Sequence, residues 1–587
     1  MTKQKFQHIY NQTNQQCQQF EKQSNQYALI RFGFLVLMII CILVGYFQHK
    51  SFLYMISLLC IVIFSIMVYF HNRIKKELSY HQAFLTVYEK HLLRMNNQWH
   101  QFHKTGEEFL DDKNYKALDL DIFGHHSLFQ MINISFTQKG QEELAFLLTN
   151  DHQKKDIEKR QEAVNELSQH EDFVLKMETL GTMIPAHKEK IVKRWLQQCL
   201  EQHISSITPF VFIVSLITLL GLLGVCFSIA LPYSQIVLEI GAIFQLCFAF
   251  FYLKKHNDLF EPINDLCTGL KSYAHIYAHI HNQHFESPYL RELQHEICID
   301  GQAQEGIHEL YKISQRVTYR QNIFAYIILN AFGLFDFMIR NQYVRWLEKY
   351  SSSVSIWFDG LAKFEALMSL SVLKIDDFHV TMPHITSQKT LKMRSIRHPL
   401  IADEKVVGND FIMQDSLCII TGSNMSGKTT FMRTIGLNLV LAYAGGFVFA
   451  DELQCSCMHI MTSMRVKDNV EEGISTFYGE LLRIKDMIEY AKKKEPMLSL
   501  IDEIFKGTNS LDRIAGAKAT IQKLSLPYAY TFLTTHDLEL SHMQALNYHF
   551  DEYYQDNHIC FDYRIKKGPS QTTNGQFLLK QLGILDE

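Results

Sequence analysis

Residues 417–429 read LCIITGSNMSGKT, and this stretch decides the fold of the C-terminal third of the chain. Leu417 to Thr421 is an apolar, β-type run, and the residues from Phe431 onward are compatible with a helix. Between the two, Gly422 and Gly427 permit a tight loop whose backbone N–H groups face an anion at the start of the helix. The stretch therefore predicts a phosphate-binding loop between a strand and a helix.

The side chains of this loop have distinct predicted roles. Lys428 would bring a positive charge to the β- and γ-phosphates of a nucleotide, and the hydroxyl of Thr429 would be a ligand for Mg²⁺. The alternative is a glycine-rich turn that has arisen by chance and binds nothing. The predicted nucleotide-binding residues are Gly422, Ser423, Asn424, Met425, Ser426, Gly427, Lys428, Thr429 and Thr430.

Two further apolar runs end in groups that suit phosphate chemistry. Met497 to Ile501 is followed by Asp502 and Glu503, and Thr531 to Thr535 is followed by His536. At the mouth of a parallel sheet, Asp502 would hold Mg²⁺ through water, and Glu503 would orient or deprotonate the attacking water. His536 would sense or stabilise the γ-phosphate, although each group could also be a solvated strand end. Three strands that each carry a phosphate-directed group predict an ATPase that uses ATP and Mg²⁺. The predicted catalytic residues are Lys428, Glu503 and His536, and the predicted metal ligands are Thr429 and Asp502.

At this point the residues carry a family resemblance, because the chain looks like a MutS-family ATPase. Upstream, Arg397-His398-Pro399 resembles the entry to the family's ATPase domain, and Tyr563 to Ile584 resembles its closing segment. The family's pattern has Pro and Gly where this chain has Ser423 and Ser426. The motifs that carry the resemblance, in family order, are Thr421 to Thr430, Gly473 to Phe477, Asp502-Glu503-Ile504 with Gly507-Thr508, and Thr535-His536.

The resemblance also implies how the site is completed. In the family, the serine that corresponds to Ser475 reaches the nucleotide of the partner subunit, which predicts a homodimer through the ATPase domain with two composite sites. The alternative is an ordinary helix cap, because Ser475 lies at a predicted helix start. More weakly, Leu118 to Leu148 resembles the start of the family's core domain, and Glu365 to Leu367 resembles its lever region. A mismatch-recognition domain has no room before this core, so we expect any DNA binding to lack mismatch preference.

Two pairs of apolar runs predict membrane hairpins. Ala28 to Phe47 and Phe52 to Phe70 form the first pair, and Thr208 to Leu231 and Gln235 to Leu253 form the second. Each run is close to the roughly 20 residues that a helix needs to span a bilayer. A cleaved signal peptide or buried core helices are the alternatives, but a signal peptide is shorter and core helices usually carry a polar stripe.

Positive charges next to these runs predict the orientation of the hairpins. Arg73, Lys75 and Lys76 follow the first pair, and Lys254 and Lys255 follow the second. Because basic residues accumulate on the cytoplasmic side, we expect a multi-pass protein of the cell (plasma) membrane. Both termini, the helical regions and the ATPase domain would then face the cytoplasm.

Two other features need a separate interpretation. Phe324 to Ile339 is apolar but contains Asn330 and Asp336, which favours a buried soluble helix over a fifth membrane span. His275, His279, His281 and His284 crowd together, and two of them have the i,i+4 spacing that can chelate a metal. Without an acidic partner, a solvated or packed helix face is the preferred interpretation of this cluster.

The composition limits the possible functions. The formal charge is −4, with 57 Lys and Arg against 61 Asp and Glu, so any nucleic-acid contact must be local. The 12 cysteines are scattered and form neither a disulfide framework nor a zinc site, which fits a reducing cytosolic compartment for the soluble part.

The expected fold is multidomain, with an α-helical core and lever region that carries two transmembrane helical hairpins, followed by a C-terminal α/β P-loop domain of the ABC type. The expected function is a membrane-anchored ATPase whose dimer opens and closes with ATP, with DNA as a candidate ligand. The alternatives are an ATP-driven membrane transporter and a nucleotide-dependent membrane scaffold. The expected segments are 1–27 (polar), 28–70 (hairpin), 71–207 (helical core), 208–253 (hairpin), 254–390 (core and lever) and 391–587 (ATPase).

Overall fold

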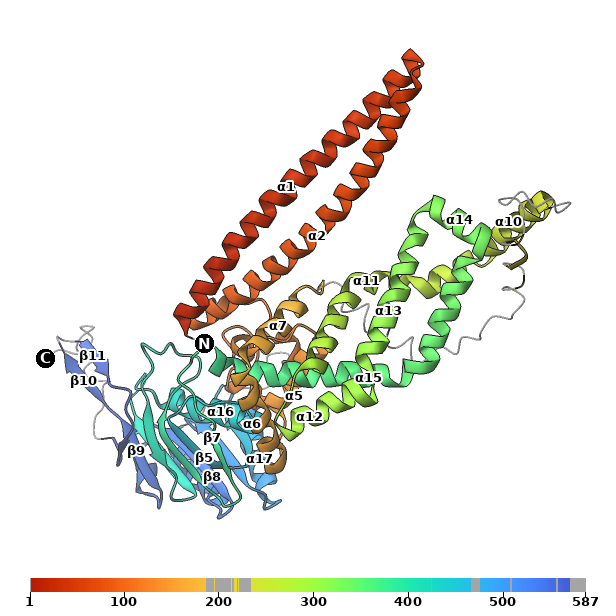
Figure 1. Ribbon diagram of the computed structural model, residues 1–587. Helices are drawn as coiled ribbons and strands as arrows, with labels where there is room; N and C mark the ends of the chain where they lie inside the picture. The colour runs from red at the N-terminus through yellow and green to blue at the C-terminus, as the bar shows by residue number, and fades with distance from the viewer. Residues whose placement is uncertain are drawn as a thin grey trace.

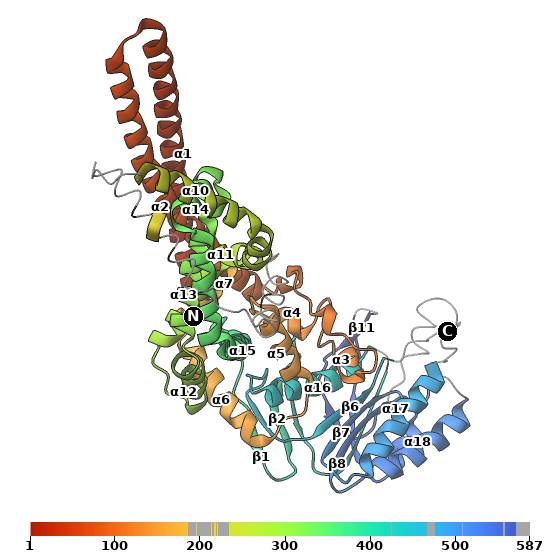
Figure 2. The same ribbon diagram turned by 90° about the vertical axis from the view of Figure 1, so that its right-hand side faces the viewer.

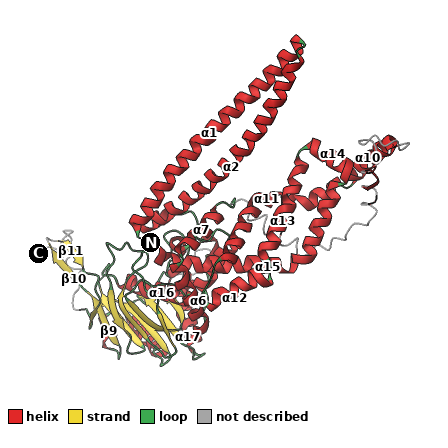
Figure 3. Ribbon diagram, viewed as in Figure 1, coloured by secondary structure: helices red, strands yellow, loops and turns green. Residues whose placement is uncertain are grey.

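The chain folds into a helical N-terminal region and a C-terminal α/β domain, as Figure 3 shows by the separation of helices from strands. This arrangement confirms the expected combination of a helical region with long apolar helices and an α/β ATPase-type domain. The computed structural model describes residues 2–185, 234–423, 425–465, 476–506, 509–555 and 558–570, together with Trp195, Ile213, Leu216, Ile217, Thr218 and Leu220.

The first two helices form a long antiparallel hairpin that projects from the rest of the molecule (Figures 1 and 2). Helix α1 spans Lys3–Gln48 and α2 spans Ser51–Met95, and their apolar halves meet at the far tip. Both are long and apolar enough to cross a membrane, and only 11% of each most apolar window is buried. The polar residues before Ala28 belong to the same continuous helix, so the apolar tip stands on a helical stalk.

A second apolar projection is made by α10 (Ser234–Phe251) and α14 (Ile323–Gly333), which lie side by side in Figures 1 and 2. The rings of Phe250 and Tyr326 are 6.0 Å apart between the two helices. This projection points away from the α/β domain in the same general direction as the α1/α2 tip. The preceding predicted run, 208–231, lies almost entirely outside the described residues.

The expectation of one buried helix over Phe324 to Ile339 was wrong. The helix breaks after Gly333, α15 (Phe335–Ile375) leaves at 82°, and Phe324 on α14 is 76% exposed. The two polar residues face inward at the break: the Asp336 amide donates to Asn330 Oδ1 at 3.1 Å. The Asp336 carboxylate accepts from Arg320 at 2.8 and 2.9 Å. Since these groups satisfy one another, the apolar side chains of α14 are left on the outside.

The helical core packs around α15, which contacts α5 and α6 along its length. Glu365 on α15 accepts hydrogen bonds from the amide and hydroxyl of Thr137, each at 2.9 Å, and burial raises the pKa of its carboxyl to about 8. The other helices of the core are α3 (Tyr115–Asp119), α4 (Leu128–Ile132), α5 (Gln138–Thr149), α6 (Lys154–Gln169), α7 (Glu171–Thr182), α11 (Leu253–Asn282), α12 (Pro288–His295) and α13 (Ala303–Thr318). Short single turns are η1 (Trp99–Gln101), η2 (Glu107–Phe109), η4 (Glu296–Asp300) and η5 (Tyr319–Gln321).

A cluster of four buried charged side chains joins the hairpin to this core. His91 and Arg94 near the end of α2 meet Glu178 on α7 and Asp376 just after α15. All four are at most 2% exposed. Because separating such a cluster would strand charges in an apolar interior, it fixes the base of the stalk to the lever helix α15. We refer to these four residues as the stalk joint.

The α/β domain is built on a six-stranded sheet with strand order β12-β9-β4-β8-β7-β6, in which only β12 is antiparallel. Its strands are β4 (Leu417–Gly422), β6 (His459–Ser463), β7 (Met497–Asp502), β8 (Ala529–Thr535), β9 (Leu546–Phe550) and β12 (Lys566–Lys567). A four-stranded sheet, in the order β1-β5-β2-β3, contains β1 (His384–Thr386), β2 (Leu391–Ile396), β3 (Asn409–Ile412) and β5 (Glu452–Ser456). A separate hairpin pairs β10 (Glu552–Gln555) with β11 (His558–Phe561).

Helices cover both faces of the large sheet. On one face lies α16 (Lys428–Ala444), which shares a hydrophobic core with the helical region; on the other lie α17 (Thr476–Ala491) and α18 (Ser510–Leu524). A short turn, η6 (Leu538–His542), follows β8. Arg160 on α6 donates to the carbonyls of Ala444 and Tyr443 at 2.8 and 3.0 Å, so the helical core caps the C-terminal end of α16.

Candidate nucleotide site

The loop after β4 has the tight backbone that its glycines predict. Gly422 has φ +145° and Gly427 has φ +112°, where an L side chain would be strained. A Cβ at position 422 would also lie 2.7 Å from the carbonyl oxygen of Phe550, so this position requires glycine. Helix α16 begins at Lys428, which places the positive end of its dipole at the loop. Asn424 lies outside the described residues.

Lys428 is folded back onto the loop. Its ammonium group donates to the carbonyl oxygens of Gly422 at 2.9 Å and Ser423 at 2.8 Å, and the side chain is nearly buried. Burial lowers the pKa of Lys428, while Glu503 and Asp502 act in the opposite direction. A phosphate in the loop would therefore compete with these two carbonyl oxygens for the Lys428 ammonium group, which already lies at the loop.

Thr429 and Asp502 form an oxygen pair at the edge of the sheet. The Thr429 hydroxyl donates to Asp502 Oδ2 at 2.8 Å, and the Thr534 hydroxyl donates to Asp502 Oδ1 at 2.5 Å. The sheet register brings them together, because Thr421 pairs with Thr535 and Asp502 pairs with Thr534. A hydroxyl and a carboxylate beside a phosphate loop are the donors that Mg²⁺ accepts, so these residues fit that ion.

Glu503 and His536 meet at the same edge. His536 Nε2 lies 2.9 Å from Glu503 Oε1, and Lys506 Nζ lies 3.0 Å from Glu503 Oε2. The hydrogen bond with His536 is the largest influence; with the help of Lys506 it outweighs burial and lowers the pKa of Glu503 to about 2. Glu503 is therefore a carboxylate at neutral pH, able to accept a hydrogen bond from a water molecule.

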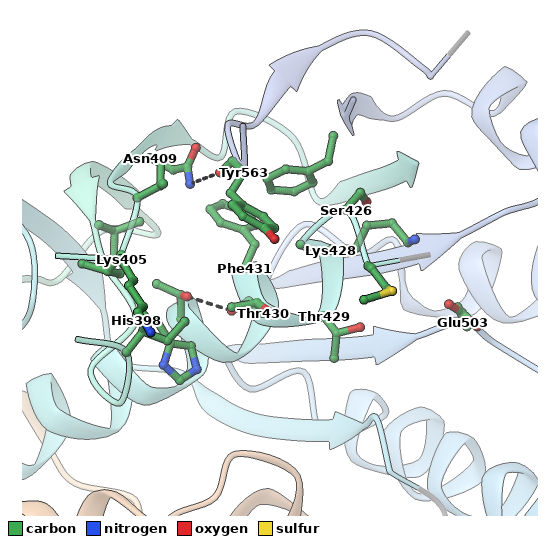
Figure 4. A pocket seen from close by; sticks show the side chains of 18 residues that line it. His398, Lys405, Asn409, Ser426, Lys428, Thr429, Thr430, Phe431, Glu503 and Tyr563 are labelled. Carbon is green, nitrogen blue, oxygen red and sulfur yellow. Dashed lines mark hydrogen bonds between the residues drawn. The ribbon is translucent and has the colours of Figure 1, made fainter. Parts of the chain in front are cut away.

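Lys428, Thr429 and Glu503 line one cavity of about 730 Å³, a size that holds a small-molecule ligand. Asp502 and His536 are hydrogen-bonded to Thr429 and Glu503. Figure 4 shows Ser426, Lys428, Thr429 and Glu503 toward one end and His398 and Lys405 toward the other. Burial, aided by Arg433, lowers the pKa of His398 to about 4, so its ring is neutral at physiological pH.

Sequence reasoning missed the second end of this cavity. Its lining comes from the segment between β2 and β3, and from Phe550 and Tyr563 far along the chain. Asn409 joins the two parts, since its side chain donates to the Tyr563 carbonyl at 3.0 Å and accepts from the Ile565 amide at 2.8 Å. The Arg397-His398-Pro399 motif and the segment that begins at Tyr563 pointed to this region, but neither indicated a pocket wall.

Glu552 is a second residue that the sequence did not reveal. Its carboxylate accepts from the Ser423 hydroxyl at 2.6 Å, and the side chain is nearly buried. The start of β10 is thereby tied to the phosphate loop at a position where the family pattern has proline. Ser426, the other departure from that pattern, lies 1% exposed in the cavity wall, and Met425 beside it is 85% exposed.

The remaining candidates are distributed as follows. Thr430 contributes to the cavity lining and accepts a hydrogen bond from Thr434 through its carbonyl. Ser475 lies outside the described residues, although α17 begins one residue later. In the histidine cluster, the ring of His279 stacks on Phe173 at 4.7 Å, and no metal-binding group of three or more His, Cys, Asp or Glu occurs among the residues the structure describes.

A parallel sheet with a glycine loop after one strand and acidic groups after another defines the α/β P-loop ATPase class. The comparison with family models is more specific: residues 418–584 match MutS domain V. The C-terminal part of this chain is thus a MutS domain V, which is an ABC-type ATPase domain. This finding confirms the resemblance seen in the motifs.

Curated proteins similar to this chain include two that are named DNA mismatch repair protein MutS. The protein from Streptococcus agalactiae serotype Ia is 29% identical over 253 residues, which make up 40% of this chain and 29% of the relative. The protein from Haloquadratum walsbyi is 32% identical over 241 residues, which make up 38% of this chain and 25% of the relative. The chain therefore spans less than a third of the length of either relative.

Proposed function

We propose that this chain is a membrane-anchored ATPase that binds ATP with Mg²⁺ at the edge of the six-stranded sheet and hydrolyses it to drive opening and closing of a homodimer. One observation carries this proposal. Lys428, Thr429 and Glu503 line a single cavity of nucleotide size, and Asp502 and His536 are hydrogen-bonded to Thr429 and Glu503.

The proposed roles follow from the positions of the side chains. Lys428 exchanges its two backbone acceptors for the β- and γ-phosphates. Thr429 and Asp502 hold Mg²⁺, which when bound neutralises phosphate charge. Glu503 accepts a hydrogen bond from the water that attacks the γ-phosphate, and the proton of that water leaves toward the carboxylate or solvent. We further propose that His536, which contacts Glu503, donates a hydrogen bond toward the γ-phosphate.

The membrane part of the proposal rests on the two apolar projections. The exposed tip of α1 and α2, and the pair formed by α10 and α14, point away from the ATPase domain in the same direction (Figure 1). Basic residues lie on the domain side of both projections. We place these projections in the cell membrane and the helical core and ATPase domain in the cytoplasm.

DNA is the ligand that the relatives' names suggest for the helical core. Because the similarity covers 40% of this chain or less, DNA binding belongs to the proposal and not to the findings. We propose binding without preference for a mismatch, and dimerisation through the ATPase domain with Ser475 completing the partner's site, since MutS-family ATPases typically dimerise.

The test is ATP hydrolysis by the full chain in lipid nanodiscs, with and without duplex DNA, across salt concentrations. Lys428→Ala should lose ATP binding, whereas Glu503→Gln should bind ATP and fail to release phosphate. Lys492→Ala, whose side chain is 65% exposed directly after α17, is the control and should behave as wild type. Equal hydrolysis by wild type and Glu503→Gln would refute the proposed chemistry.

A further inference from the structure

Helix α17 carries two buried charged residues that the proposed chemistry does not use. Glu480 and Arg483 are each 7% exposed, although glutamate and arginine are rarely buried without partners. They are three positions apart and therefore lie on one face of the helix. Their partners belong to two different parts of the molecule.

Glu480 holds the turn that carries Glu503. Its carboxylate accepts a hydrogen bond from the Phe505 amide at 2.5 Å and also faces the Lys506 amide. Glu503 has φ +51° and Phe505 has φ +61°, a left-handed conformation that is strained for an L-residue. Because the turn is strained, its shape depends on external contacts, and Glu480 supplies one of them.

The Glu503 end of the turn is anchored differently. The Glu503 amide donates to the carbonyl and the hydroxyl of Thr534 at 3.1 and 3.0 Å. One end of the strained turn is therefore tied to the neighbouring strand β8, while the other is tied to α17. A displacement of α17 relative to the sheet would change the turn between the two anchors.

Arg483 connects the same helix to the helical core. Its guanidinium donates to both carboxylate oxygens of Asp119 at 3.1 and 2.9 Å and lies 4.2 Å from the ring of Tyr115. Asp119, at the end of α3, is fully buried and also accepts from the amides of Met464 and Arg465, each at 3.0 Å. A buried carboxylate with four hydrogen bonds is a rigid attachment.

From these contacts we infer that Glu480 is a positioning residue for Glu503. The Asp119–Arg483 pair transmits movement of the helical core through α17 to Glu480, and Glu480 transmits it to Glu503. The inference rests on the proposed role of Glu503 and adds how that role is controlled. One helical turn separates the two contacts, so a shift of α17 that follows Asp119 must also shift Glu480. The helical core would then regulate hydrolysis without touching the nucleotide.

The first experiment compares Glu480→Ala, Glu480→Gln and Glu489→Ala in nanodiscs. Glu489 lies on the same helix but is 53% exposed, which makes it the matched control. We expect Glu480→Ala to lower kcat by roughly tenfold to a hundredfold with ATP affinity unchanged, because small displacements of a catalytic group have effects of that size. Glu480→Gln keeps an acceptor for the Phe505 amide and should recover most of the rate. If Glu480→Ala lowers kcat no more than Glu489→Ala does, or if Glu480→Gln fails to recover the rate, the inference is wrong.

A double-mutant cycle distinguishes positioning from general damage to the fold. In the Glu503→Gln background, single-turnover hydrolysis should be no slower with Glu480→Ala than without it, since the group to be positioned is gone. If Glu480→Ala slows single-turnover hydrolysis by the same factor in the Glu503→Gln background as in wild type, the inference is wrong. A different result tests the proposed function itself, which is wrong if wild type and Glu503→Gln hydrolyse ATP equally.

The second arm tests the connection to the core. Asp119→Asn keeps one acceptor oxygen, for either the Met464 or the Arg465 amide, and removes the charge that holds Arg483. We expect it to lower kcat by several-fold with unchanged ATP affinity, and to cause no further loss when combined with Glu480→Ala. An unchanged kcat in Asp119→Asn, with its melting temperature equal to that of wild type, would refute the transmission step.

Discussion

Raising the pH should loosen the stalk joint, because one of its four charges is a histidine. His91 is fully buried, with Nδ1 2.5 Å from Asp376 Oδ1 and Nε2 3.0 Å from Glu178 Oε2. Arg94 completes the cluster through Asp376 Oδ2 at 2.6 Å. The informative perturbations are deprotonation of His91 and the variant His91→Gln, which cannot carry a charge.

The folding stability that is lost at high pH follows from the pKa of His91. Burial alone would lower it, but Asp376 and Glu178 outweigh burial and raise the pKa from 6.5 to about 9. At about 1.4 kcal/mol per pKa unit, this rise corresponds to about 3 kcal/mol of folding stability. Because the folded-state pKa lies above the unfolded one, this stability is fully present below about pH 6.5 and is lost as the pH rises through about 9.

The assay is thermal unfolding of the full chain in detergent between pH 6 and pH 10. Wild type should lose melting temperature steadily above pH 7. His91→Gln should already melt lower at pH 6 and change less with pH, so that the two curves converge at alkaline pH. Since other groups titrate equally in both proteins, only the difference between the curves is interpreted. Parallel curves over the whole range would refute the assignment of the charge to His91.

Four other predictions concern the site and the membrane. Thr429→Ala should raise the Mg²⁺ concentration for half-maximal hydrolysis about tenfold, and an unchanged requirement would remove Thr429 from the metal site. Lys428→Ala and Ser475→Ala should each be nearly inactive yet partly restore activity in a verified heterodimer; no restoration would place Ser475 outside a composite site. Duplex DNA with a mismatch should bind no more than tenfold, or about 1.4 kcal/mol, more tightly than paired DNA, as fluorescence anisotropy would measure. Thiol reagents outside intact cells should not label Cys560, and labelling would reverse the proposed topology.

The half of the cavity that we propose binds phosphate was predictable because its groups come directly after strands. Residues that follow parallel strands reach the same edge of a sheet, and the pairing of Asp502 with Thr534 places Glu503 and His536 there together. Local patterns therefore sufficed for this half. The other end depends on Asn409 and Tyr563, which are distant in sequence and belong to segments without a periodic pattern, so only the folded chain reveals it.

The misjudged α14 shows a different limit. The length of the run from Phe324 to Ile339 and its polar residues Asn330 and Asp336 favour a buried soluble helix over a membrane span when only the sequence is considered. In the structure they bond to each other across a break, and Arg320 neutralises the aspartate. A sequence pattern reports the polarity of a residue but not whether a partner will satisfy it.

The continuous helix α1 was missed for a related reason. Its Gln- and Asn-rich beginning has only moderate helix propensity, and propensity is a weak guide when tertiary packing contributes. Here the packing partner is α2. Ser24 and Arg31 on α1 both contact His71 on α2, at 3.1 and 2.8 Å. His71 lies 47 and 40 residues away from these two partners, outside any local window.

The membrane placement and the proposed dimer constrain each other. Two copies anchored in one bilayer with the same orientation can be related only by a two-fold axis along the membrane normal, because any other two-fold axis would invert one copy. The dimer must therefore form side by side, with both ATPase domains at the same distance from the membrane. The stalk joint holds each α1/α2 hairpin rigidly to its lever helix α15, so closure of the ATPase domains must move the membrane tips laterally or bend the stalks. The substitution Gln82→Pro in the stalk would bend α2 and relieve this constraint. We expect this variant to bind ATP as wild type does and to show weaker coupling between membrane anchoring and hydrolysis.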